Sequence, residues 1–308
     1  MKAMTYERYG APGDVLELRD RPKPKVAPGE VLVRVSTAAV NPVDWKLMAG
    51  YLDEMMPTFF PVTPGWDVAG VVEEVGLDTP EFRPGDEVLA YARKDFLHDG
   101  SFAEYLSVPV RAVAGKPASV DWNQAAGLPL AGLTAYQLLT RLGLSGADTV
   151  LVHAASGGVG VLAAQLARAE GARVIGTASP ANHEFLRGFG VEPVSYGDGL
   201  PERVRELAPD GVDLVADFVG GVVDDTLAVL REGGRHGSVA DPSVAERGGR
   251  YAWVRPSGAD LSVLAGLVAE ESVVVPIAET FPLDRAAEAL ELNQGGHVRG
   301  KVTVRVAA

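Results

Sequence analysis

The sequence predicts an α/β protein in which a doubly wound parallel sheet accompanies a β-rich, barrel-like domain. From about residue 122 to 272, helical stretches alternate with short apolar strands. This alternation implies a parallel sheet with helices on both faces. Residues 1–121 are instead rich in Val, Pro and Gly, and the tail from Val273 returns to strand-like sequence. We therefore expect residues 1–121 and 273–308 to form one domain and residues 122–272 the other.

Short alternating apolar runs predict the strands of the first domain. Examples are Val31–Val35 and Val68–Val75, and turn signals separate such runs. The turns at 27–30 and 83–86 both place Pro before Gly, as a type II turn prefers. These patterns are typical of a β-barrel.

Residues 149–160 contain the most informative motif of the chain. Val150–Val152 is predicted as a buried strand, and apolar residues in 159–170 recur at helical spacing. Strand, glycine turn and helix form the Rossmann dinucleotide-binding arrangement, in which the helix N-terminus faces the pyrophosphate. Ala155 replaces the first glycine of the G-x-G-x-x-G pattern. The predicted cofactor contacts are Ser156, Gly157, Gly158, Val159 and Gly160.

The next strand, 171–179, bears on which dinucleotide binds. An NAD-selective site places Asp or Glu near the end of this strand, where it bonds the ribose 2′-hydroxyl. Thr177, Ala178 and Ser179 stand there instead, so nothing repels a 2′-phosphate. The expected cation is less clear, because Arg187 occupies a helical position that can face solvent and His183 is only partly charged at neutral pH. NADP(H) is favoured.

The rest of the second half completes the predicted sheet and the tail. Strands are expected at 149–153, 173–177, 193–196, 213–217 and 235–239, with a tail helix at 283–293 and a final strand at 301–306. Residues 250–255 are predicted as a strand that ends before Pro256. Late strands of this kind lie at a sheet edge, where pairing with a second subunit satisfies open backbone groups. We expect a homodimer.

Composition excludes several classes of protein. The net charge of −13 argues against nucleic acid or an anionic membrane surface as partner. No apolar stretch reaches membrane length, and the first residues lack the apolar core of a signal peptide, so a cytoplasmic location is expected. The chain has no cysteine, and its five histidines show no metal-binding spacing. No metal site is predicted.

Several ordered segments resemble the medium-chain dehydrogenase/reductase superfamily, in particular its zinc-independent, quinone-oxidoreductase-like branch. The resemblance runs from end to end, and the segments are Ala39–Asp44, Pro64–Val72, Phe82–Val88, Gly100–Tyr105, Pro129–Tyr136 and Gly296–Lys301. It implies a GroES-like β-barrel catalytic domain beside the Rossmann domain. Its zinc-dependent members carry cysteine and Gly-His-Glu ligands, whereas this chain has Asn41 near the first position and Trp66-Asp67 in place of His-Glu. Reduction of a conjugated C=C bond or a quinone, which needs no Lewis acid, is therefore the expected chemistry.

The resemblance also implies residues of the reacting end of the site. Asn41 and Asp44 match an N-x-x-D that lies beside the nicotinamide in the family; the alternative is a turn at Asn41 and a helix cap at Asp44. Tyr51 matches a tyrosine whose hydroxyl can donate to the substrate oxygen, or else it packs at the end of a helix. Lys46 replaces the usual arginine between them. Thr134 matches a residue near the nicotinamide, with a helix-interior threonine as the alternative.

The 2′-phosphate pocket implied by the family is only partly present. Ser179 matches the phosphate-binding position and Tyr196 matches a tyrosine beside the adenosine phosphate. The expected basic residue is missing at Ala181, with His183 as the nearest substitute. Arg299 and Lys301 lie in the tail motif, and one of them is expected to supply the missing charge. The alternative for both is a solvated cation at a strand end.

The leading hypothesis is an NADPH-dependent, zinc-independent reductase of quinones or α,β-unsaturated carbonyls that works by direct hydride transfer. Catalysis is assigned to Tyr51, Asn41 and Asp44. A hydrophobic substrate wall or ordinary packing explains the apolar cluster of Trp45, Leu47, Met48, Met55, Met56, Phe59 and Phe60. Two alternatives stay open: reduction of an enoyl thioester in a biosynthetic pathway, and a non-catalytic NADPH-binding sensor or structural protein.

Overall fold

A computed structural model describes residues 1–306, which fold into two compact units. Unit 1 comprises Met1–Leu133, Pro256–Glu271 and the chain from Val275 onward, and unit 2 comprises Thr134–Arg255 and Ser272–Val274. These borders differ from the predicted ones at 121 and 272. Two helices of the predicted second domain account for the difference. The helices α3 (Trp122–Gly127) and α9 (Gly258–Ala269) pack on the strands of unit 1.

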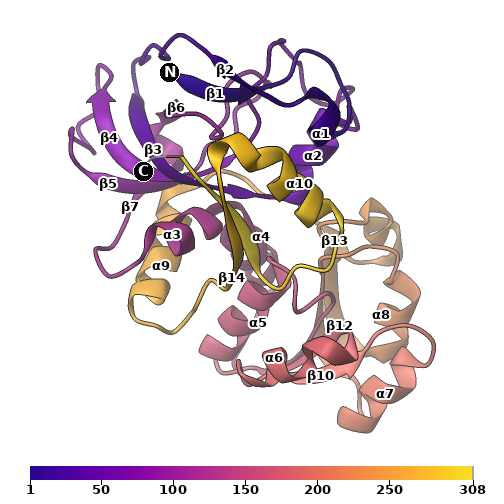
Figure 1. The fold of residues 1–308 in the computed structure, drawn as a ribbon. Helices are drawn as coiled ribbons and strands as arrows, with labels where there is room; N and C mark the ends of the chain where they lie inside the picture. The colour runs from indigo at the N-terminus through magenta and orange to yellow at the C-terminus, as the bar shows by residue number, and fades with distance from the viewer. Residues whose placement is uncertain (307–308) are drawn as a thin grey trace. The chain divides into compact units, whose positions relative to one another are not determined.

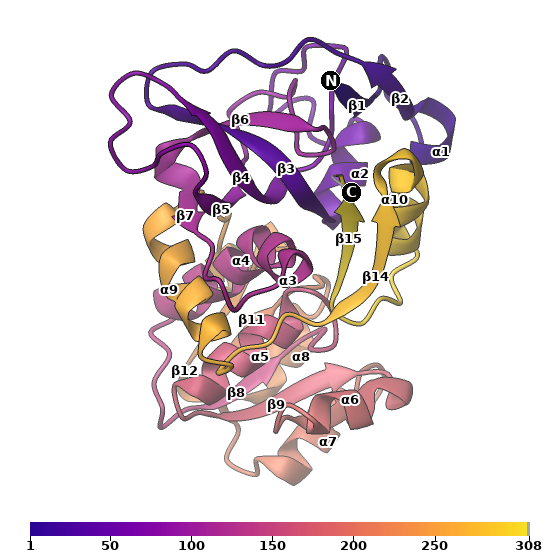
Figure 2. The same cartoon turned by 60° about the vertical axis from the view of Figure 1, so that its left-hand side comes forward.

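Unit 1 is built around a seven-stranded, mostly antiparallel sheet with the order β14-β15-β3-β4-β5-β7, and β6 also pairs with β3. These strands are β3 (Glu30–Val40), β4 (Asp67–Val75), β5 (Glu87–Tyr91), β6 (Tyr105–Pro109), β7 (Val113–Gly115), β14 (Ile277–Pro282) and β15 (Lys301–Arg305). The tail strand β15 lies beside β3 (Figure 2) and runs antiparallel to it, with Val302 opposite Val40. Residues from both ends of the chain therefore meet in one sheet.

Buried apolar side chains of this sheet form the core of unit 1, and short helices surround the sheet. The cluster includes Val31, Val33, Val68, Val72 and Leu106, whose alternating positions follow the period-two pattern of the sequence. The strands β1 (Lys2–Thr5) and β2 (Glu17–Asp20) form a separate two-stranded sheet. The remaining elements of unit 1 are α1 (Pro12–Val15), α2 (Pro42–Met48), η1 (Val110–Ala112), η4 (Leu283–Arg285) and α10 (Ala286–Gln294). The helices α2 and α10 lie side by side (Figure 1).

Unit 2 is the doubly wound parallel sheet that the alternating sequence predicts. Its six strands have the order β10-β9-β8-β11-β12-β13, and every pairing between them is parallel. They are β8 (Thr149–Val152), β9 (Arg173–Ala178), β10 (Glu192–Ser195), β11 (Val212–Asp217), β12 (Leu230–Ser238) and β13 (Arg250–Tyr251). The chain moves outward from β8 to β10 and then returns to β11. This reversal makes the carboxyl ends of β8 and β11 the switch point where ligands bind in such sheets.

Helices cover both faces of the sheet because right-handed crossovers before and after the reversal lie on opposite sides. These helices are α5 (Gly160–Ala169), α6 (His183–Arg187), α7 (Leu200–Leu207) and α8 (Val223–Val229), and α4 (Pro129–Arg141) precedes β8. Figure 1 shows α7 beside α8. The short 3-10 helices η2 (Pro180–Asn182) and η3 (Pro242–Arg247) complete unit 2. The predicted strand at 250–255 shortens to the two residues of β13, which lies at the edge of the sheet.

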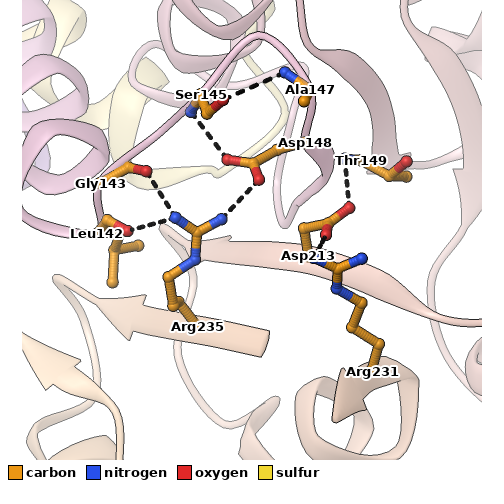
Figure 3. A network of polar contacts seen from close by, with 9 residues as sticks. All are labelled: Leu142, Gly143, Ser145, Ala147, Asp148, Thr149, Asp213, Arg231 and Arg235. Carbon is orange, nitrogen blue, oxygen red and sulfur yellow. Dashed lines mark hydrogen bonds and ion pairs between the residues drawn. The ribbon is translucent and has the colours of Figure 1, made fainter. Parts of the chain in front are cut away.

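A network of polar contacts joins Arg235 of β12 to the segment that leads into the amino end of β8. The Arg235 guanidinium donates to the carbonyl oxygens of Leu142 (3.2 Å) and Gly143 (2.6 Å) and to the Asp148 carboxylate (2.6 Å), as Figure 3 shows. Asp148 in turn accepts the backbone N–H of Ser145 at 2.8 Å. This network lies at the opposite end of the sheet from the switch point, so it serves the fold.

Candidate functional site

The glycine turn between β8 and α5 has open space beside Gly157 and is tightly packed at Gly160. A Cβ atom at Gly157 would meet nothing closer than the Ala154 carbonyl oxygen at 3.4 Å. At Gly160 the same atom would lie 2.1 Å from that oxygen, which no side chain tolerates. The two glycines therefore do what the motif predicts: Gly157 leaves an open backbone surface, and Gly160 brings α5 against the strand. These features fit a bound pyrophosphate.

The structure explains why Ala155 stands in place of the first motif glycine. Ala154 adopts the left-handed conformation with φ of 54° and makes the turn itself. Ala155 is buried against the next strand, where a Cβ at Gly176 would lie 2.7 Å from the Ala155 Cβ. The space for the methyl group thus comes from a glycine in β9. Thr177 holds the turn there, because its hydroxyl and carbonyl oxygens accept the N–H groups of Ala154 and Ala155 at 3.0 Å.

The carboxyl end of β9 carries no acidic side chain. Ala178 is 3% exposed and points into the protein, so Ser179 is the first half-buried residue after the strand. In η2, the Asn182 side-chain amide donates to the Ser156 hydroxyl at 3.1 Å. His183 Nε2 is buried and makes no hydrogen bond in residues 1–306. Asn182, a residue not selected from the sequence, thus joins Ser156 of the glycine turn to the segment between Ser179 and His183.

The other basic and aromatic residues near this loop have defined places. Tyr196 follows β10 and is 63% exposed. The Arg203 guanidinium donates to the carbonyl oxygens of Ser195 and Asp198 and so closes the turn after β10. Arg187 pairs with Glu184 on the same helix at 3.3 Å, with both side chains exposed. Arg299 is an exposed residue of unit 1.

In unit 1, a buried network at the end of β3 joins four polar residues, Asn41, Asp44, Asp67 and Lys301. Asn41 Nδ2 donates to Asp67 Oδ2 at 2.8 Å, and Lys301 Nζ donates to the Asn41 side-chain oxygen and to the Val40 carbonyl oxygen. Asp67 Oδ1 accepts the N–H of Leu130 in the first turn of α4 at 2.7 Å. No role was assigned to Asp67 from the sequence. Its position at the start of the apolar run that forms β4 was a signal that its carboxylate is buried.

The buried network alters the titration of its members. Burial raises the pKa of Asp44 to about 7, although its Oδ2 accepts the backbone N–H of Asn41 at 2.8 Å. Its other oxygen, Oδ1, is buried and makes no hydrogen bond in residues 1–306. Burial also raises the pKa of Asp67 and lowers that of Lys301, and the attraction between the two charges opposes both shifts.

These placements bear on the alternatives for three predicted residues. Asp44 does cap α2, as the helix-cap alternative has it, but it does so inside the network that also contains Asn41. Lys301 is only 4% exposed and holds Asp67 and Asn41, so it is not the solvated strand-end cation of the alternative, and its ammonium group is engaged within unit 1. Thr134 is buried inside α4.

Tyr51 projects from the end of α2. Gly50 takes the left-handed conformation with φ of 80°, and the Tyr51 N–H donates to the Lys46 carbonyl oxygen at 3.0 Å, which ends the helix. The Tyr51 side chain is 72% exposed. It therefore does not pack within unit 1, and its hydroxyl is accessible to a ligand.

The apolar cluster near α2 divides into a buried and an exposed part. Leu47, Met48 and Met56 belong to the core, whereas Met55, Phe59 and Phe60 are exposed. Trp45 donates its indole N–H to Asn293 at 3.2 Å. A small pocket in unit 1 is lined by Tyr6, Leu47, Trp66, Phe96 and His98 among others. Core packing thus explains Leu47, Met48 and Met56. The exposed rings of Phe59 and Phe60 lie edge-on against Phe96 and Tyr6, which line this pocket.

The structure shows no metal centre in residues 1–306, because no three His, Cys, Asp or Glu side chains gather in a way that fits an ion. Trp66 is buried and packs edge-on against Tyr91, with ring centroids 6.0 Å apart. Neither a thiolate nor a histidine stands at this position.

A GroES-like β unit and a Rossmann unit with an open glycine turn define a two-domain dehydrogenase or reductase of the nicotinamide-dependent type. Residues 27–118 match the family of alcohol dehydrogenase GroES-like domains, and residues 190–304 match the family described as zinc-binding dehydrogenase. The chain is 36% identical to the NADPH-dependent alkenal/one oxidoreductase of Arabidopsis thaliana, over 99% of this chain and 79% of that protein. The chain belongs to the medium-chain dehydrogenase/reductase superfamily, among its quinone-oxidoreductase-like members, and is an oxidoreductase.

Other relatives support the same family. The chloroplastic quinone-oxidoreductase homolog of Spinacia oleracea is 30% identical, with 99% of this chain and 98% of that protein covered. The quinone oxidoreductase from Coxiella burnetii superposes with a TM-score of 0.89 at 34% identity, covering 100% of this chain and 99% of that one. A structure described as an NAD-dependent alcohol dehydrogenase has the same TM-score at 31% identity, with both chains fully covered. Related proteins are therefore named for both NADPH and NAD.

None of the helices in residues 1–306 is long and apolar enough to cross a membrane. Relatives are named for chloroplasts and mitochondria, which are compartments of those proteins. The cytoplasmic location of this chain stays a prediction.

Proposed function

We propose that this protein is an NADPH-dependent, zinc-independent reductase of α,β-unsaturated carbonyl compounds or quinones. The observation that carries the cofactor assignment is the carboxyl end of β9, where Ala178 is buried and Ser179 offers a hydroxyl in place of a carboxylate. A carboxylate there would repel a 2′-phosphate and favour NAD. The relatives named as an alkenal/one oxidoreductase and as quinone oxidoreductases support the substrate class.

The reaction needs little from the protein beyond binding and a proton. NADPH, when bound, supplies a hydride. For an enone, the hydride's electron pair and hydrogen form a new C–H bond at the β-carbon, the C=C π bond breaks, and negative charge moves to the carbonyl oxygen. One proton then completes the saturated ketone, so the substrate gains two electrons and two hydrogens. A quinone gains the same and becomes a hydroquinone.

The chain's own residues divide this work between the two units. In unit 2, the backbone from Ser156 to Gly160 holds the pyrophosphate, and the loop with Ser179 and His183 holds the adenosine end. Tyr196 of unit 2 and Arg299 of unit 1 belong to the same proposed set of cofactor contacts, and Thr134 contacts the nicotinamide region.

In unit 1, the amide of Asn41 contacts the nicotinamide or the substrate, and Asp44 and Asp67 hold Asn41 in place. Tyr51, with its accessible hydroxyl, donates a hydrogen bond or proton to the substrate oxygen. Lys301 is proposed here as part of the Asn41 network, since its ammonium group already contacts Asn41 and Asp67. The protein acts as a homodimer through the open edge beyond β13.

Two measurements test this proposal. Loss of NADPH absorbance is followed with a panel of enones and quinones, and turnover of several of them is expected. Oxidation of NADPH by none of them overturns the assignment as a reductase. Fluorescence titration should show that NADPH binds at least about tenfold tighter than NADH, a difference of about 1.4 kcal/mol. Equal or reversed affinities would overturn the NADPH assignment alone.

A further inference from the structure

The Asn182 side chain connects two segments of unit 2 that are separate in sequence. It lies in η2, just after β9, and its amide nitrogen donates to the Ser156 hydroxyl in the glycine turn at 3.1 Å. The backbone N–H of Asn182 donates to the Ser179 carbonyl oxygen at 2.8 Å, so the position of Asn182 is tied to the end of β9. The contact therefore sets the spacing between the glycine turn and the segment that follows β9.

The direction of this hydrogen bond decides what Ser156 can do. A serine hydroxyl donates one hydrogen bond and accepts others. Since the Ser156 oxygen accepts from Asn182, its own proton is directed elsewhere, and no acceptor for it is found in residues 1–306. Ser156 is half-buried and stands beside Gly157, where the backbone surface is open. Through Asn182 the Ser156 side chain also lies beside η2, so its hydroxyl is placed to donate to a phosphate bound between the glycine turn and η2.

We propose that Asn182 is a positioning residue for cofactor selectivity: it orients the Ser156 hydroxyl as a donor to the 2′-phosphate of NADPH. This inference rests on the proposed NADPH dependence. Asn182 and Ser156 together then take the place of the basic side chain that the family resemblance implies.

The charges of unit 2 support an uncharged donor at this place. The guanidinium of Arg203 is engaged with the carbonyl oxygens after β10, and Arg187 pairs with Glu184. Residues 177–183 contain no Asp or Glu, so this segment places no negative charge beside the hydroxyls of Ser179 and Ser156 that would repel a phosphate. Replacing Asn182 by aspartate removes the donor and adds a charge at nearly constant volume, which makes the position sensitive to a single substitution.

Calorimetric titration with two cofactor fragments tests the inference without turnover. Adenosine 2′,5′-bisphosphate carries the 2′-phosphate, and adenosine 5′-monophosphate lacks it. The wild-type protein should bind the bisphosphate at least about tenfold tighter. Asn182→Ala and Ser156→Ala should each reduce this ratio about three- to tenfold, and Asn182→Asp should abolish or reverse it. Affinity for the monophosphate should change less than about twofold, which serves as the control within each variant.

A double variant shows whether Asn182 acts through Ser156. In the Ser156→Ala background, Asn182→Ala should have little further effect on the ratio, because the oriented hydroxyl is already absent. Ser243→Ala, which removes an exposed hydroxyl bonded to Asp241, is the matched control and should leave the ratio unchanged. A thermal unfolding midpoint close to wild type confirms that each variant is folded.

The outcomes separate the inference from the function on which it rests. If wild type prefers the bisphosphate but both Asn182 variants keep the same ratio within about twofold, the role of Asn182 is wrong and the NADPH assignment stands. If wild type shows no preference for the bisphosphate, the NADPH assignment fails and the inference fails with it.

Discussion

The ammonium nitrogen of Lys301 lies 3.6 Å from a carboxylate oxygen of Asp67, and both side chains are almost completely buried. The two residues come from the last and the fourth strand-forming segments of unit 1, and β3 lies between them in the sheet. Asn41, at the end of β3, accepts from Lys301 and donates to Asp67, so its amide has a single orientation. The pair thus holds the residue that we place at the reacting end of the site.

Removing the cation of this pair should destabilise the protein strongly. Lys301→Met leaves the Asp67 carboxylate buried without its partner, and we expect the free energy of unfolding to fall by about 3–5 kcal/mol. The double variant Asp67→Asn/Lys301→Met should regain a large part of this loss, because no buried charge is left at the pair and the Asn41 amide can rotate to match an asparagine. Urea denaturation measures both. A loss below about 1 kcal/mol in the single variant would contradict the arrangement.

The raised pKa of Asp44 predicts a specific pH dependence of stability. Burial raises this pKa from 3.8 to about 7, so the folded protein binds the proton more tightly than the unfolded chain. The Asp44 carboxylate therefore costs stability progressively as pH rises from about 4 to above 7. Asp44→Asn removes this cost and keeps an oxygen that accepts the N–H of Asn41.

The measurement compares Asp44→Asn with wild type by urea denaturation across this range. The stability of the variant relative to wild type should increase by on the order of 2–4 kcal/mol between about pH 4.5 and pH 8. A difference that stays constant with pH would show that Asp44 titrates normally in the folded protein.

Tyr51→Phe tests the proposed donor. Negative charge develops on the substrate oxygen, so loss of the hydroxyl should lower kcat by about 10²-fold with an enone. The effect should be smaller with a quinone, whose reduced form is the better-stabilised anion, and NADPH affinity should hardly change. Tyr251→Phe, at another exposed tyrosine, is the control. Steady-state kinetics with an unchanged kcat for both substrates would exclude Tyr51 as the donor.

The network at the amino ends of the unit 2 strands should matter for stability and not for binding. Arg235→Met leaves the buried Asp148 carboxylate and two carbonyl oxygens without their donor, and we expect a loss of about 1–3 kcal/mol in the free energy of unfolding. Arg231→Met, which breaks the more exposed pair with Asp213, should cost less than about 1 kcal/mol. NADPH affinity should stay within about twofold of wild type in both. If both variants lost the same free energy of unfolding, the difference in burial between the two ion pairs would not matter and the prediction would be wrong.

Much of the fold followed from local patterns in the sequence. The strand, glycine turn and helix at 149–170 appear as β8, the turn and α5, and the alternating runs of the first half appear as β3 and β4. Such patterns are readable because a strand repeats every two residues and a helix every 3.6. Ala155 was recognised as a departure from the glycine motif, but its partner Gly176 was visible only once β9 lay beside the turn.

Three features could be predicted from the sequence, since each depends on neighbours along the chain: the two kinds of domain, the glycine turn and the lack of an acidic residue after β9. The folded chain was needed to see that Lys301 is buried against Asp67 and Asn41, that Ala178 points inward, and that Asn182 contacts Ser156. The reason is physical: these contacts depend on the register of strands that are distant in sequence. A single-residue change in register would turn Asp67, Ala178 or Lys301 to the other face of its sheet.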